Sequence, residues 1–145
     1  MNRYDKSTGL FQNHTASDAQ SDGLTHSSIW CIVKDNQGTL WLGTYFGGVN
    51  YFNPEYEIYS RYMYSPIEKK GLSNPVVGRT IEDKDGNLWI GTEGGGLNYY
   101  NRRTREFKWF RPEIGPNSIS HNNIKALYYC LLYTSDAADE ARSVD

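Results

Sequence analysis

The sequence has few of the features that define the commoner protein classes. Its two cysteines, Cys31 and Cys130, share no metal-like spacing and do not indicate a disulfide framework. No apolar run reaches the roughly 18 residues of a membrane span, and residues 1–20 lack the basic-then-apolar pattern of a signal peptide. The formal net charge of -2 gives no reason to expect nucleic acid or an anionic membrane as a partner.

Helical patterning and catalytic clusters are missing as well. No window sustains an apolar period of about 3.6 residues, so no long helix is expected. The three histidines, His14, His26 and His121, are isolated, and the sequence contains neither an HExxH motif nor a Cys/His cluster. The glycines at 47–48 and 94–96 follow strand-like segments without opening a helix, so they are not phosphate loops. We therefore expect no metal and no cofactor.

What the sequence does contain is a long internal repeat. GTLWLGTYFGGVNYFN at 38–53 returns 48 residues later as GNLWIGTEGGGLNYYN at 86–101. Between residues 23–53 and 71–101, 13 of 31 aligned positions are identical. The shared residues include a turn, a Trp and a Gly-Thr pair, namely Asp35, Gly38, Trp41, Gly43 and Thr44 in one copy and Asp83, Gly86, Trp89, Gly91 and Thr92 in the other. Repeats of this length indicate solenoids, propellers or arrays.

Each repeat carries four short strand signals separated by turn residues. In the first copy these cover residues 29–34, 39–45, 49–52 and 57–63. A period in the high forties with four strands matches a β-propeller blade, whose repeats are roughly 40–50 residues long. The sequence thus predicts an all-β fold, a partial β-propeller of about three four-stranded antiparallel blades with a repeat of about 48 residues. Trp41 and Trp89 are expected to be buried in equivalent gaps between blades.

The repeat also predicts the boundaries of the units. Residues 1–22 read as the end of a preceding blade and its connecting loop, and residues 23–70 and 71–117 as one blade each. Residues 118–129 begin another unit as the first strand of a truncated blade. In residues 130–145 the composition shifts to Ala, Asp, Glu and Ser, and the phrase CLLYTSDAADE resembles translated sequencing-adapter read-through. We expect a non-native tail there, with a natural helical or disordered tail as the alternative.

The motifs GTLWLGT and GNLWIGT, each preceded by Asp and followed by GGVNYFN or GGLNYYN, resemble two-component regulator propeller repeats. The resemblance covers residues 2–129. It implies a parent of the kind found in gut Bacteroidetes, with periplasmic propellers, a Y_Y_Y-type β-sandwich and a transmembrane helix. Histidine kinase, receiver and DNA-binding domains would follow on the other side of the membrane.

The same resemblance implies a role for this segment. It would be a periplasmic part of an inner-membrane sensor kinase, itself without enzymatic activity, membrane contact or a transmembrane segment. Its partners would be the remaining propeller blades of the parent chain, and the parent would be a homodimer. Proteins of this kind commonly sense oligosaccharides, so the implied ligand is a glycan.

Other classes remain open. A lyase-type propeller resembling streptogramin lyases would use a His and a Glu from neighbouring blades as acid and base. A propeller could also serve only as a protein-docking module. A glycosidase is disfavoured, because Asp35 and Asp83 recur once per blade at the same turn, where a carboxylate usually caps the backbone.

The best candidates for ligand contacts lie where the two copies diverge. In the loop between the second and third strands, one copy has Tyr45 and Phe46 and the other has Glu93 and Gly94. Exposed aromatic rings beside a carboxylate suit a sugar, since the rings stack on its apolar faces and the carboxylate accepts from its hydroxyls.

Three further residues are candidates on weaker grounds. Arg79 replaces Cys31 at the equivalent first-strand position and is expected to face the central channel as a hydrogen-bond donor. His26 and Asn74 occupy equivalent slots in the loop entering the first strand, as does His121 one unit later. They would form a polar rim for a sugar, or would simply hold the loop.

Overall fold

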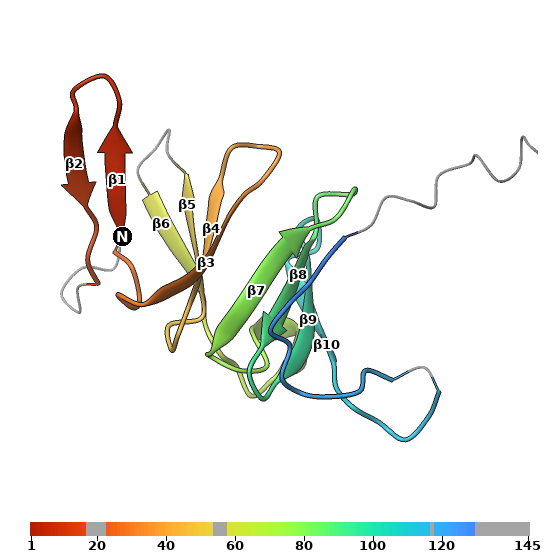
Figure 1. Ribbon diagram of the computed structural model, residues 1–145. Helices are drawn as coiled ribbons and strands as arrows, with labels where there is room; N and C mark the ends of the chain where they lie inside the picture. Colours follow the sequence, from red (N-terminus) through yellow and green to blue (C-terminus); the bar gives the residue numbers. More distant parts are fainter. Residues whose placement is uncertain (17–22, 54–57, 117, 130–145) are drawn as a thin grey trace, which may run out of the picture.

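The computed structural model describes residues 1–16, 23–53, 58–116 and 118–129, and within these ranges almost all regular structure is strand (Figure 1). The helical exception there is a single 3₁₀ turn, Glu68–Lys70, and no helix of these residues is long and apolar enough to cross a membrane. The strands are β1 (Asn2–Asp5), β2 (Leu10–Asn13), β3 (Ile29–Lys34), β4 (Leu40–Thr44), β5 (Val49–Asn53), β6 (Ile58–Tyr62), β7 (Val77–Glu82), β8 (Leu88–Thr92), β9 (Gly96–Asn101) and β10 (Glu106–Phe110).

The strands form two four-stranded sheets and one hairpin. The first sheet has the order β3-β4-β5-β6, the second β7-β8-β9-β10, and β1 pairs with β2. Every pairing is antiparallel and joins strands that follow one another in the sequence. Figure 1 shows the hairpin, the first sheet and the second sheet in a row. The predicted all-β fold of partial propeller blades is confirmed.

The N-terminal hairpin repeats the outer half of a blade. Its register matches that of the last two strands in each sheet, because the partners Tyr4↔Phe11, Phe52↔Tyr59 and Tyr100↔Phe107 follow one another at intervals of 48 residues. The hairpin packs beside the first sheet at a small apolar cluster of Leu24, Leu42 and Phe52, to which Met1 adds a partly buried side chain.

The recurring Asp holds the turn between the first two strands of each sheet. Asp35 Oδ1 accepts hydrogen bonds from the backbone N–H groups of Gln37 (2.9 Å) and Thr39 (2.8 Å). Its Oδ2 accepts one from the indole of Trp41 at 2.7 Å. This carboxylate therefore fixes both the turn and the orientation of the Trp ring.

Asp83 makes the same three contacts in the second sheet. Its Oδ1 accepts from the N–H groups of Asp85 and Asn87 at 3.0 and 2.8 Å, and its Oδ2 accepts from Trp89 at 3.3 Å. Gly38 and Gly86 close the two turns at φ of 85° and 78°, a backbone region that disfavours other residues.

The Gly that follows each Trp allows the next unit to approach closely. A Cβ on Gly43 would lie 2.5 Å from Cys31 Sγ and 2.6 Å from Val77 Cγ1. A Cβ on Gly91 would lie 2.7 Å from the side chain of Ile124. Strand β7 thus packs closely against β4 at Gly43, and the segment 118–129 packs in the same way against β8 at Gly91.

The expected first strand over residues 118–129 is not formed, although its path is the expected one. The N–H of Gly48 donates to Pro75 O (3.1 Å), and one unit later the N–H of Gly96 donates to Asn122 O (2.8 Å). Only an isolated bridge, Glu93↔Asn123, is found in the segment. A first strand takes its ladder bonds from the second strand of its own blade, and no described residue provides one.

The main core lies between the two sheets. The first sheet contributes Trp41 and Val49, and the second contributes Leu88, Ile90 and Tyr100, all buried in one cluster. In the first sheet, Trp41 belongs to this cluster and Leu42 to the cluster beside the hairpin, so neighbouring residues of β4 are buried on opposite faces. Burial of several large side chains makes this interface the principal hydrophobic contribution to stability.

Trp89 departs from the expectation that both Trp side chains are buried. Trp41 is 4% exposed, whereas Trp89 is half-buried beside Tyr99 and Phe110. The two rings make the same hydrogen bond within their own sheets, but Trp41 is covered by the second sheet and nothing described covers Trp89 to the same extent. Burial of this Trp is a property of the stack, not of the single unit.

Arg102 completes the contact between the sheets. It lies in the turn after β9, stacks over the Trp41 ring at 5.0 Å, and donates to Asp35 Oδ2 at 2.5 Å. Burial alone would raise the pKa of Asp35, but hydrogen bonds from Trp41, Thr39 and Arg102, together with the Arg102 charge, outweigh it and leave the pKa lowered. The repeat gave no sign of this residue, because Pro54 occupies the equivalent position.

Candidate functional site

The candidate ligand-binding face is formed by the loops between the second and third strands and those that enter the first strands. A buried Asn anchors these loops in each sheet. Asn50 accepts from the N–H of Thr25 (3.0 Å) and donates to its Oγ1 (2.7 Å). Asn98 makes the same pair of bonds to Ser73, at 2.8 and 2.9 Å. The loops that enter the first strands are thereby tied to the third strand of their own sheet.

The Thr of the Gly-Thr pair shapes the loop that carries the divergent residues. Thr44 Oγ1 donates to Gly48 O (2.8 Å) and accepts from the N–H of Gly47 (3.0 Å). This closes the chain around residues 45 and 46, which are left at the tip. Tyr45 is 37% exposed and Phe46 is 54% exposed. The fold therefore presents two rings to solvent on a fixed turn.

These two rings belong to a larger aromatic group, consisting of His26, Trp30, Tyr45 and Phe46. Tyr45 stacks on Trp30 with centroids 4.9 Å apart and contacts Phe46 edge-on at 4.4 Å. His26 meets both rings edge-on at 6.3 and 6.5 Å. Trp30, on β3, is 44% exposed. The group forms a partly exposed aromatic surface from the inner strand to the loop tip.

Trp30 was not a candidate from the sequence, although a signal for it was present. It aligns with Gly78 in the other copy, a divergence as large as that of Tyr45 against Glu93. In the first strand, only the exchange of Cys31 for Arg79 had indicated a candidate. The structure shows that the two divergent positions lie against each other.

The polar residues of the entering loops hold the backbone. The N–H of Ser28 donates to His26 Nδ1 (3.0 Å), the N–H of Val76 to Asn74 Oδ1 (2.9 Å), and the N–H of Asn123 to His121 Nδ1 (2.9 Å). All three bonds span two residues, so each side chain stabilises a local turn. His26 additionally contacts the rings of the aromatic group. Among the described residues, no contact is found between Asn74 and these rings.

Arg79 lies in a pocket beside the aromatic group. It shares a hollow of about 480 Å³ with Trp30 and Ile32 of β3, and the other lining residues are Met1, Asn2, Ser27, Ile29 and Cys31. The Arg79 side chain is exposed, whereas Cys31, its counterpart, is buried against the second sheet. The pocket thus connects the inner strands β3 and β7 with the N-terminal strand.

Glu93 is placed apart from the aromatic residues with which the sequence grouped it. Its carboxylate lies 3.7 Å from Lys125 Nζ, and its backbone bridges to Asn123. No recorded contact joins Glu93 to Tyr45 or Phe46 among the described residues. It faces the segment that follows the second sheet.

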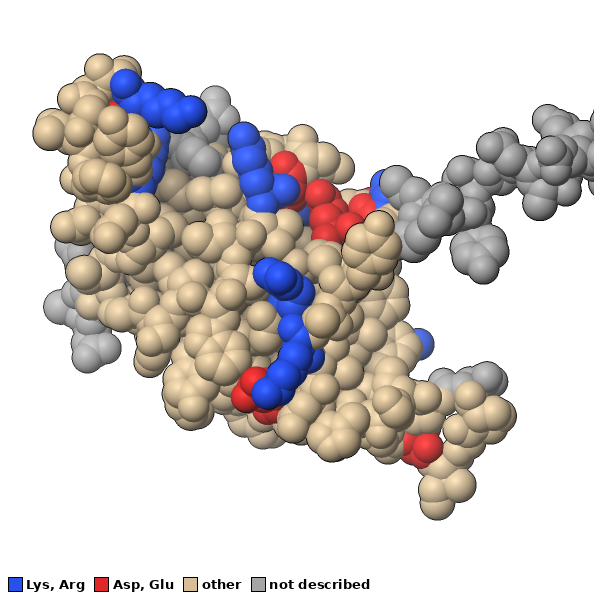
Figure 2. Space-filling view, in the orientation of Figure 1, with Lys and Arg blue, Asp and Glu red and all other residues tan. Residues whose placement is uncertain are grey.

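Charged side chains are sparse on the face seen in Figure 2, where small separate groups of both signs lie among uncharged residues. Among the described residues, no three His, Cys, Asp or Glu side chains gather in a way that could hold a metal ion. Around Trp30, the side chains that could contact a ligand are the aromatic rings of Tyr45 and Phe46 and the Arg79 guanidinium.

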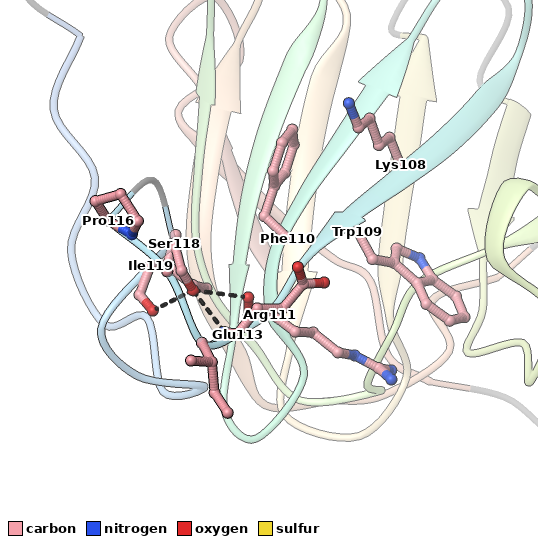
Figure 3. A pocket seen from close by; sticks show the side chains of 10 residues that line it. Lys108, Trp109, Phe110, Arg111, Glu113, Pro116, Ser118 and Ile119 are labelled. Carbon is pink, nitrogen blue, oxygen red and sulfur yellow. Dashed lines mark hydrogen bonds between the residues drawn. The ribbon is translucent and has the colours of Figure 1, made fainter.

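A second hollow, of about 390 Å³, lies beside β10 and the loop after it (Figure 3). Its rings are already engaged, since Trp109 donates to Gly71 O at 2.9 Å and Arg111 stacks on it at 4.8 Å. Phe110 stacks on Trp89, and Ser118 Oγ accepts from the N–H of Glu113. These contacts fasten the loop to the sheet, so we regard this hollow as the weaker candidate.

Comparison with known proteins defines the class of this fold. Residues 23–46 and 71–94 match the family model described as "two component regulator propeller". The two matched segments span β3, β4 and the turn between them in the first sheet, and β7 and β8 in the second. Both copies of the repeat therefore match the two-component regulator propeller model, as the sequence motifs indicated.

Two similar solved structures are of the extracellular domain of BT4673 from B. thetaiotaomicron. One, described as a hybrid two component system, is 26% identical with a TM-score of 0.57 over 75% of this chain. The other, described as a one component system, is 27% identical with a TM-score of 0.59 over 74% of this chain. The match covers 15% of each of those chains. No curated protein matches the chain.

Proposed function

We propose that this chain is a segment of the extracytoplasmic propeller of a hybrid two-component sensor, and that its loop face takes part in detecting an oligosaccharide. The proposed parent is an inner-membrane homodimer with histidine kinase activity in other domains. The remaining blades of the same parent chain would be the immediate partners of this segment. Support for the class comes from the matched repeats and from similarity to extracellular domains of such systems.

The single observation that carries the ligand proposal is the aromatic group. Tyr45 and Phe46 are exposed on a turn fixed by Thr44, and the exposed Trp30 of β3 stacks on Tyr45. Exposed aromatic rings stack on the apolar C–H faces of sugars. Such a surface on a rigid scaffold is pre-organised, which lowers the entropic cost of binding.

An enzyme of the lyase type is the second candidate, and the geometry favours it less. Its chemistry would need a His beside a Glu of the neighbouring blade. The ion pairs of the described residues include none between a His and a Glu, and the Nδ1 atoms of His26 and His121 accept hydrogen bonds within their own loops. A protein-docking disc is also compatible with the fold, and exposed aromatic rings would suit a protein partner as well.

Extension of the reading frame in the parent gene tests the class of protein. A membrane span followed by a histidine kinase is the expected result. A stop codon after six or seven blades would contradict the sensor and favour the lyase or docking alternatives.

The ligand proposal is tested by replacing Tyr45 and Phe46 with Ala, one at a time, in the proposed ectodomain. We expect each change to weaken oligosaccharide binding about tenfold or more, because stacking contacts of this kind are worth about 1–2 kcal/mol. Asn74→Ala serves as a control, since Asn74 holds an equivalent loop outside the aromatic group. Unchanged affinity in both aromatic variants, with folding intact, would contradict the proposal.

A further inference from the structure

The pocket beside the aromatic group is unusual in its charge. Of its eight lining residues, Arg79 alone has a charged side chain, and none is acidic. The other lining groups are apolar, such as Ile29, Trp30 and Ile32, or neutral and polar, such as Asn2 and Ser27. The amino terminus of Met1 is the other cation at the wall, and it donates a hydrogen bond to His14 O. A ligand here would therefore meet cationic groups and no anionic one.

Arg79 has no anionic partner within the part of the chain that the structure describes. The ion pairs recorded there join Lys69 to Glu106, Arg102 to Asp35 and Glu82, and Lys125 to Glu93. Arg102 shows how this protein uses an arginine for structure, with one carboxylate at 2.5 Å and an indole ring beneath it. Arg79 is exposed and makes neither contact, so its five donors remain available to a ligand.

The guanidinium and the aromatic surface lie in one continuous site. Trp30 lines the pocket with Arg79 and also stacks on Tyr45, which leads to Phe46 at the loop tip. A sugar ring lying on Trp30 would have its substituents close to the pocket. A planar anionic group on that ring could pair bidentately with the guanidinium, as carboxylates do with arginine.

We infer that this site takes an acidic saccharide, with Trp30 and Tyr45 stacking on the sugar and Arg79 binding its anionic group. The inference rests on the proposed function and makes it more specific, because a neutral oligosaccharide would leave the guanidinium without an anion. The anionic group is the carboxylate of a uronic acid or a sulfate ester. Arg79 is the specificity-determining residue that separates acidic from neutral sugars.

The test uses the 145-residue chain at low concentration, with folding checked by near-ultraviolet circular dichroism and binding measured by titration calorimetry. The probes are trigalacturonic acid, its fully methyl-esterified form and glucose 6-sulfate. We expect the free acid or the sulfate ester to bind at least about tenfold more tightly than the neutral ester, the usual effect of one charge-assisted pair. The two acidic probes distinguish the two sources of the charge.

Arg79→Gln should abolish the preference for the acidic probe while keeping the near-ultraviolet spectrum. The matched control is Arg103→Gln, an exposed arginine in the turn after β9, and it should leave the preference unchanged. Should Arg79→Gln fail to fold, the comparison of acid and ester on the unchanged chain still decides the question.

Equal affinity for the free acid and its ester, with the sulfate ester no better, would overturn this inference and leave the proposed function standing. An equal loss in the Arg103→Gln control would also overturn it, because the effect would then be one of overall charge. Failure of every probe, and of neutral oligosaccharides as well, would overturn both proposals together.

Discussion

At the scale of the residue, the two copies of the repeat provide an internal comparison. Asp35 and Asp83 accept the same two backbone hydrogen bonds and the same indole bond. Asp35 additionally pairs with Arg102 from the neighbouring sheet, and its side chain is fully buried. The turn contacts are the same at both positions. A difference in the free energy lost when each Asp is mutated therefore measures the contact between the two sheets.

We predict that Asp35→Asn lowers the free energy of unfolding by about 2–4 kcal/mol, because it leaves the Arg102 charge partly buried without its carboxylate. Asp83→Asn should cost only about 1 kcal/mol, the value of an ordinary hydrogen bond. Urea denaturation monitored by tryptophan fluorescence measures both. Equal losses at the two positions would show that Arg102 adds nothing to the stack.

Asp35 also predicts how stability depends on pH. Its pKa is lowered in the folded protein, through the bonds from Trp41 and Arg102 that outweigh burial. A group of this kind stabilises the fold above its unfolded pKa of about 3.9, and that contribution is lost as the pH falls through the folded value. Unfolding free energies between about pH 5 and 2 should therefore fall more steeply in the original chain than in Asp35→Asn. Parallel curves would contradict the assignment.

At the scale of the element, the residues of each strand determine how closely the strands of the neighbouring sheet can pack against it. Gly43 has room for no side chain because β7 lies directly against β4 at Val77. Trp41 and Val49 on one sheet meet Leu88 and Ile90 on the other in the same layer. The stack is thus maintained by close approach at the inner strands and by ring packing farther out.

We predict that Gly43→Ala costs about 1–3 kcal/mol, since a methyl group there overpacks the contact with Val77 and Cys31. The double variant Gly43→Ala, Val77→Ala should be less destabilised than the sum of the two single changes, because removing the Val77 methyl groups makes room. Thermal unfolding of all four proteins measures this coupling. Strict additivity would mean that the two residues do not touch.

Elements were more predictable from the sequence than contacts between them. The strands of both sheets, their order and the turn at Asp35 followed from the repeat, because these depend on local residues that are copied. The exposure of Trp89 and the missing strand at 118–129 did not, since both depend on a neighbouring element. Arg102 could not be inferred from the residues that the copies share, because its counterpart is Pro54, whereas the divergence of Trp30 from Gly78 was a signal for that residue.

At the scale of the whole molecule, the second sheet presents an apolar face that the described residues cover only in part. Trp89, Tyr99 and Phe110 pack on one another there and remain half-buried. The equivalent face of the first sheet is buried under the second. A large aromatic patch of this kind favours association with another surface.

We predict that the 145-residue chain associates with itself as its concentration rises, through this face. Tyr99→Lys should reduce the association, because it places a charge in the middle of the patch. Tyr4→Lys is the matched control, because Tyr4 is exposed on the N-terminal hairpin and not on the second sheet, and it should have little effect. Sedimentation velocity measures the outcome, and a chain that is monomeric at all concentrations would contradict the prediction.

The central claim is that the two repeats are adjacent blades, the second covering the Trp of the first. Fluorine NMR of the chain labelled with 5-fluorotryptophan tests this most directly, with the four Trp signals assigned by single Trp→Phe variants. On transfer from H₂O to D₂O, the signal of Trp41 should stay almost unchanged, while those of Trp89 and Trp30 should move. A solvent shift at Trp41 as large as that at Trp89 would contradict the stacking of the two blades.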